Sequence, residues 1–93
     1  MDEIERAERL SAIQRLVEKA EKAYDEMYEV YSRHDIDRCY RDAKDYYTDA
    51  IGLAHRLDLN DEADKFQKRL WHIKEVFFSQ FAGQGTSPTN ASS

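Results

Sequence analysis

Apolar residues recur at steps of three and four along three separate stretches of this chain. In an α-helix that spacing places every member of a run on one face, so each stretch predicts an amphipathic helix with one apolar stripe. The first stripe is Leu10, Ile13, Val17, Ala20, Tyr24, Met27 and Tyr31, the second is Ile36, Tyr40, Ala43, Tyr47, Ala50, Ala54 and Leu57, and the third is Leu59, Ala63, Phe66, Leu70, Ile73 and Phe77. Three stripes with short connections predict an all-α fold.

The stripes and their flanking residues predict helices over about 3–33, 36–57 and 61–81. Short turns make consecutive helices antiparallel, so we expect an up-down-up three-helix bundle that forms a single domain, residues 1–81. The remaining stretch, 82–93, has no charged residue and no large apolar residue. A segment of that composition cannot bury enough apolar surface to fold, and we expect a disordered tail.

Three positions refine this prediction. Asp2 is expected to cap the first helix, because Glu5 three residues later completes a capping-box pattern. Asn60 is expected to cap the third helix, since acidic residues follow it in the first turn. Gly52 lies inside the second helix, where it costs about 1 kcal/mol relative to Ala. It indicates either close helix packing or an exposed position that tolerates glycine.

The predicted first helix outruns its partners by about two to three turns at its N-terminus. This overhang, residues 2–9, still carries the apolar side chains of Ile4 and Ala7. Two outcomes are open at this stage: the overhang frays, or it packs on a second copy of the chain.

Composition restricts the classes of partner. The net charge is −5 and is spread along the chain, so the basic surface that nucleic-acid binding requires is missing. No apolar run approaches the ~20 residues that a membrane span needs, and the start has no signal-peptide core. The single cysteine, Cys39, cannot form an internal disulfide. We therefore expect a cytoplasmic protein that binds neither membranes nor nucleic acid.

The chain carries more apolar residues than one stripe per helix requires. Second rows run beside the stripes: Leu16, Ala23 and Val30, then Cys39, Tyr46 and Leu53, then Trp71 and Phe78. Wide stripes are common in globular helices, and this explains part of the surplus. The rest is rich in aromatic side chains, which favour interfaces. The predicted partner-binding residues are Tyr28, Tyr46, Trp71, Phe78, Ile4 and Ala7. A basic row on the third helix, which includes Arg69 and Lys74, is expected to bridge to the second helix or to an acidic partner.

The segment Tyr40–Ala54 resembles the second helix of a tetratricopeptide repeat, with small, aromatic and small residues at Ala43, Tyr47 and Ala50. In that family the small residues let two helices approach closely, and the aromatic ring fills the space between them. Tyr24, Met27, Tyr28 and Tyr31 would then supply the facing helix. The resemblance covers at most about one 34-residue repeat, whereas stacked arrays need about three. It implies a helical-hairpin interaction module and not a concave peptide groove.

Catalytic and metal-binding patterns are sparse. His34, His55, His72 and Cys39 lack the spacing of a zinc or di-iron site, so we expect no metal and no cofactor. Cys39 near the start of the second helix, with His34 five residues before it, is the one nucleophile candidate. A half-buried structural thiol is the more common role for such a cysteine. We expect no catalytic residue and no enzymatic activity.

The sequence therefore predicts a small helical protein–protein interaction module that self-associates as a homo-oligomer. The alternative is a helical bundle that binds a small apolar or aromatic molecule. In that case, small residues on one helix opposite aromatic residues on another would leave a pocket near Tyr24, Tyr47, Ile73 and Phe77.

Overall fold

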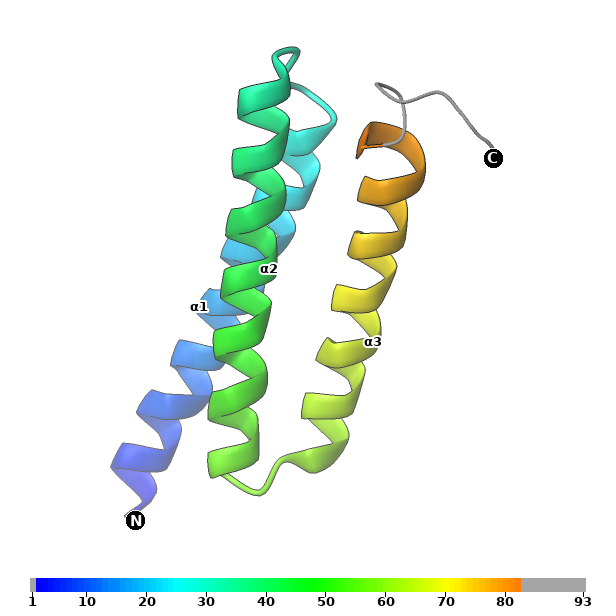
Figure 1. Cartoon of the computed structure of the whole chain (residues 1–93). Coiled ribbons are helices and arrows are strands. Elements are labelled where there is room, and N and C mark those ends of the chain that lie inside the picture. Colours follow the sequence, from blue (N-terminus) through cyan, green and yellow to red (C-terminus); the bar gives the residue numbers. More distant parts are fainter. Residues whose placement is uncertain (1, 83–93) are drawn as a thin grey trace.

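A computed structural model describes residues 2–82, and it contains three long helices that run up, down and up (Figure 1). These are α1 (Glu3–Met27), α2 (Arg33–Arg56) and α3 (Asn60–Val76), and α3 continues into one wide π-helical turn, η1 (Phe77–Ala82). The described residues include no strand. The predicted fold class is confirmed. The predicted disordered tail falls on residues of which all but the first lie outside the described range, and residue 82 belongs to η1.

Burial follows the three stripes. The buried apolar residues form two adjoining clusters along the bundle, one around Met27, Tyr47 and Ile73 and one around Ile13 and Ala54. Helix α2 packs against both α1 and α3. Two stripe members depart from the prediction, because Leu10 is exposed and Tyr31 is 97% exposed in the turn after α1.

The first helix ends at Met27, and not near residue 33 as predicted. Its last turn holds acidic residues and no basic one, so nothing there stabilises the negative end of the helix dipole. Ser32 then takes an extended conformation and its hydroxyl accepts a hydrogen bond from the Asp35 amide at 3.0 Å. This N-cap starts α2 at Arg33, three residues earlier than predicted.

The turn between α2 and α3 follows Arg56, about where the second helix was predicted to end. Asp58 adopts a left-handed conformation with φ 59°. The Leu59 amide donates to the Ala54 carbonyl at 2.8 Å, and the Asp58 amide donates to the His55 carbonyl at 3.1 Å. These two bonds define a Schellman motif, which usually has glycine where Asp58 stands.

Asn60 does not cap α3. Leu59 occupies the N-cap position without a side-chain hydrogen bond, and Asn60 is the first helical residue. Its side-chain oxygen lies 3.1 Å from His55 Nδ1 at the end of α2. The Asp2 cap of α1 is confirmed, because its carboxylate accepts from the Glu5 amide at 2.8 Å.

Gly52 faces open space, since a Cβ atom built there meets nothing within 4 Å. Of the two explanations, tolerance at an uncrowded position is therefore the correct one, and close packing is not the reason for glycine. No helix within residues 2–82 has the length and the apolar character needed to cross a bilayer.

Candidate interaction surface

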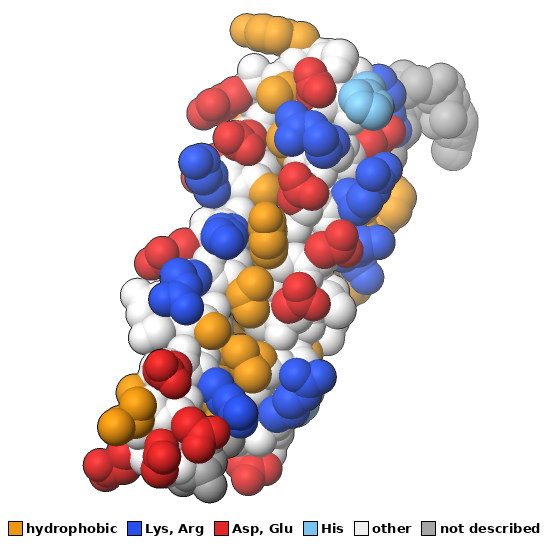
Figure 2. Space-filling view, turned by 90° about the vertical axis from the view of Figure 1, so that its left-hand side faces the viewer, with side chains coloured by type: hydrophobic (Ala, Val, Ile, Leu, Met, Phe, Trp, Pro, Cys, Tyr) orange, Lys and Arg blue, Asp and Glu red, His pale blue; other side chains and the backbone are white. Residues whose placement is uncertain are grey.

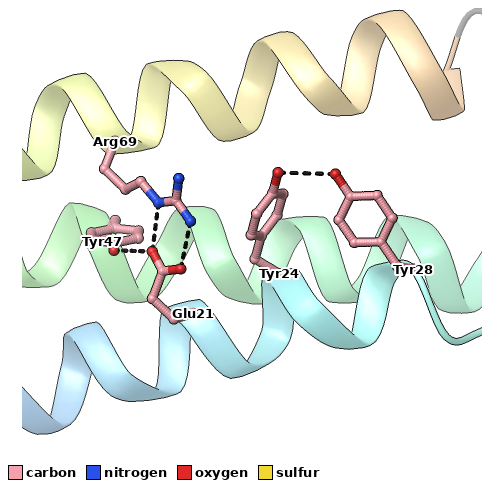
Figure 3. A network of polar contacts seen from close by, with 5 residues as sticks. All are labelled: Glu21, Tyr24, Tyr28, Tyr47 and Arg69. Atoms are coloured by element: carbon pink, nitrogen blue, oxygen red, sulfur yellow. Dashed lines mark hydrogen bonds and ion pairs between the residues drawn. The ribbon is translucent and has the colours of Figure 1, made fainter.

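A polar network joins the three helices and fixes the rotation of α3, and so which of its faces is exposed. The Arg69 guanidinium on α3 binds the Glu21 carboxylate on α1 in a bidentate pair, with Nε–Oε2 at 2.8 Å and Nη2–Oε1 at 2.7 Å (Figure 3). The Tyr47 hydroxyl on α2 donates to the same carboxylate. Bidentate charge-assisted pairs have a defined geometry, so this contact sets the rotation of α3 relative to α1.

Aromatic side chains extend this network toward the upper end of the bundle. The Arg69 guanidinium lies 5.1 Å from the centre of the Tyr24 ring, and the Tyr24 hydroxyl hydrogen-bonds to that of Tyr28 at 3.0 Å (Figure 3). The Tyr28 ring in turn meets Phe81 edge-to-face at 5.3 Å. Side chains, rather than close backbone packing, therefore connect α1 to α3.

The titration of these groups follows from the contacts. The hydrogen bonds from Arg69 lower the pKa of the Glu21 carboxyl below its usual value, although partial burial opposes this. Burial, reinforced by the hydrogen bond to Tyr28, raises the pKa of Tyr24 to about 12. Burial and then the contact with Glu21 raise the pKa of Tyr47 as well. Glu21 is thus held by its partners as an ionised carboxylate near neutral pH.

The most exposed large side chains on α3 and η1 lie outside this network. Trp71 is 62% exposed and Phe78 is 59% exposed, and with Lys74, Glu75 and Ser79 they line a shallow, open hollow on one side of the helix. We call Trp71, Lys74, Glu75 and Phe78 the Trp71 stripe. Their spacing of three, four and seven positions places them on one helical face. That face is partly apolar, and most of its two large rings is exposed.

The Phe78 end of this stripe rests on packed rings. Phe78 meets Phe77 edge-to-face at 5.1 Å and Tyr40 of α2 at 6.0 Å. Phe77 and Tyr40 stack in parallel with ring centres 4.0 Å apart. This support restricts the Phe78 side chain, which lowers the entropy cost of using it in a contact.

Of the four aromatic residues predicted to bind a partner, only Trp71 and Phe78 share a surface. Tyr28 is 51% exposed, and its ring packs edge-to-face against Phe81. Tyr46 is half-buried, packs against the core, and has the Lys19 ammonium 5.8 Å from its ring centre. Tyr46 is six positions from Tyr40 on α2, which is about 120° around the helix, so it faces away from the Trp71 stripe.

The second rows of α1 and α2 pack on each other instead of standing free. Ala23 and Cys39 are buried, and Leu16, Val30, Tyr46 and Leu53 are half-buried against the core. Figure 2 shows the side of the hairpin away from α3, where apolar side chains follow the groove between α1 and α2 and charged residues border them. Most of the apolar surplus on these two helices is therefore explained by the fold.

The overhang of α1 is present in the structure. All residues from Asp2 to Ser11 are exposed, and the buried core begins at Ile13. Ile4 is 73% exposed and lines a second shallow hollow with Ala7, Glu8, Ser11 and Arg15, which we call the Ile4 stripe. Ile4 and Ala7 lie in the first turns of α1, at one end of the bundle, whereas Phe78 belongs to η1, which lies toward the other end (Figure 1).

The residues considered for nucleophilic chemistry are separated by burial. Cys39 is buried, and this burial raises the pKa of its thiol, which disfavours the reactive thiolate. His34 is exposed in the first turn of α2. Within residues 2–82, no three His, Cys, Asp or Glu side chains come close enough together to hold a metal ion.

The four residues expected to line a ligand pocket are themselves core residues. Tyr24, Tyr47, Ile73 and Phe77 are all buried and belong to one cluster. Their side chains occupy the space between the helices, as close packing normally requires.

The Glu21–Arg69–Tyr47 contact is absent from the sequence-based prediction. Arg69 was expected to reach the second helix or a partner, whereas its carboxylate partner lies on the first helix. One signal was present: Glu21 directly follows Ala20 and precedes Tyr24 by three positions, so it borders the first apolar stripe. Searches against known protein families, curated proteins and solved structures find no match to this chain.

Proposed function

We propose that this protein is a small helical protein–protein interaction module that self-associates through the Trp71 stripe. The main observation in support of this proposal is the exposure of Trp71 and Phe78, which lie seven positions apart on one face of α3–η1. Large aromatic side chains next to each other on a surface are unfavourable in water and are enriched where proteins bind each other. A tetratricopeptide-like role for the α1–α2 hairpin remains a prediction.

The size of the domain supports the same proposal. The bundle has about 80 ordered residues, near the lower limit at which one hydrophobic core suffices, so burial of further apolar surface between copies would add stability. The small-molecule alternative has less support, because side chains of the protein already fill the place expected for a ligand.

Sedimentation velocity over a micromolar concentration series tests this proposal. The expected result is a wild-type protein whose average mass rises with concentration, and a Trp71→Ala variant that associates at least about ten-fold more weakly. The matched control is Tyr31→Ala, which removes the most exposed aromatic ring of the described residues from a site outside the stripe. Wild-type protein that stays monomeric throughout, or equal weakening by both variants, would contradict the proposal.

A further inference from the structure

The Ile4 stripe and the Trp71 stripe are both largely exposed in one copy of the chain, and their side chains differ in size in a complementary way. The Ile4 stripe presents small side chains, Ala7 and Ser11, beside one larger apolar residue. The Trp71 stripe presents two large rings. Helices pack best when large side chains on one face enter the spaces left by small ones on the other.

The charges on the two stripes are complementary as well. Glu8 in the first stripe and Lys74 in the second carry opposite charges. Neither Glu8 nor Lys74 forms an ion pair with another residue between Asp2 and Ala82. Both side chains are therefore available to a partner, and opposite charges at the border of an apolar contact fix its register.

Position in the bundle prevents the two stripes from meeting within one molecule. The Ile4 stripe begins in the part of α1 that precedes the core, near the α2–α3 turn, whereas Phe78 lies at the opposite end of α3 (Figure 1). A second copy placed antiparallel to the first would bring the overhang of each copy to the α3–η1 segment of the other. Each such pair would contain the same contact twice, as two-fold symmetry requires.

We infer that the α1 overhang of one copy docks on the Trp71 stripe of a second copy, with Ile4 and Ala7 against Trp71 and Phe78 and with Glu8 facing Lys74. This inference rests on the proposed self-association and names its second surface. It assigns the exposed overhang a role in binding, which explains how nine exposed residues, 3–11, remain helical without tertiary contacts in the monomer.

A charge exchange between two variants tests this pairing. Glu8→Lys and Lys74→Glu each place like charges in both contacts of a pair, so each variant alone should self-associate about three- to ten-fold more weakly than wild type. In an equimolar mixture, one copy of each variant can form a mixed pair. One contact of that pair joins the two substituted positions, whose charges are again opposite, and the second contact keeps the wild-type Glu8 and Lys74. The mixture should therefore recover wild-type association.

Trp71 fluorescence and sedimentation velocity give the readouts, since Trp71 is the single tryptophan of the chain and its emission should shift to shorter wavelength when it is buried. Glu18→Lys and Lys22→Glu provide matched charge reversals on α1 outside the stripe, and they should leave association unchanged. Far-UV circular dichroism checks that each variant keeps its helices. Ile4→Ser is a second test of the same exposed segment. It changes no charge, and it should weaken association too.

The outcomes separate the inference from the proposed function. If Trp71→Ala abolishes association while Glu8→Lys, Lys74→Glu and Ile4→Ser have no effect, self-association stands and the overhang is not the second surface. The same conclusion follows if the single variants weaken association and their mixture does not recover. If the wild type is monomeric, both the function and the inference are overturned.

Discussion

At the scale of single residues, the contact that defines the bundle is the one between Glu21, Arg69 and Tyr47. It joins α1, α2 and α3 at one carboxylate, and it holds the helices at a fixed rotation. The sequence indicated that Arg69 would find an acidic group, but not which one. Glu21 is 48 positions away along the chain, and only the relative rotation of α1 and α3 decides that these two side chains meet.

This contact predicts a stability that depends on acid. The pKa of Glu21 is lowered in the folded state, so its contribution is fully present above the pKa of the unfolded chain and is lost as the pH falls through the folded pKa. Glu21→Gln should reduce the free energy of unfolding near neutral pH by about 1 kcal/mol, and it should flatten the loss of stability below about pH 5.

Urea denaturation at a series of pH values measures both effects. The control is Glu18→Gln, which removes a carboxylate from the same helix. The Glu18 carboxylate accepts only a long hydrogen bond, 3.5 Å, from the Gln14 side chain. It should leave the acid dependence of the wild type in place. An equal flattening in both variants would show that the Glu21 contact does not control acid stability.

At the scale of elements, periodicity predicted the three helices and their order but not all of their ends. The stripes locate helices because each helix must bury one face, and this holds for α1, α2 and α3. Ends depend on single side chains instead. Ser32 with Asp35 three positions later was a readable cap that places the start of α2 at Arg33. The end of α2 was harder to read, because Asp58 stands where a glycine would have marked the Schellman motif.

The Asp58 conformation yields a stability prediction. A left-handed backbone costs an ordinary residue about 1 kcal/mol that glycine avoids, so Asp58→Gly should stabilise the protein by about that amount. For a domain of this size the melting temperature should rise by about 4 °C or more. Asp58→Ala is the control: it keeps the Cβ atom in the left-handed region, and its melting temperature should not rise. A melting temperature that falls in the glycine variant would show that the Asp58 side chain stabilises the turn.

At the scale of the whole molecule, the apolar surplus divides into two parts that the sequence alone could not separate. The second rows of α1 and α2 close on each other, because the hairpin brings Ala23, Cys39 and Tyr46 to one groove. On α3 the corresponding row is only partly covered: Phe78 meets Tyr40 of α2 at one side, yet both Trp71 and Phe78 remain more than half exposed. Sequence periodicity gives the face of each residue on its own helix, but which faces meet depends on the rotation of all three helices.

A dilution series of the ¹⁵N-labelled protein by NMR tests the central claim most directly, since it reports self-association and its location together. Over about 10 µM to about 1 mM, a range that brackets weak protein pairs, the Trp71 indole signal and the amide signals of residues 2–11 should shift together toward saturation. Signals of the turn around Tyr31 should stay in place. Spectra that do not change with concentration, or shifts confined to the groove between α1 and α2, would contradict an interface built from the Trp71 stripe and the α1 overhang.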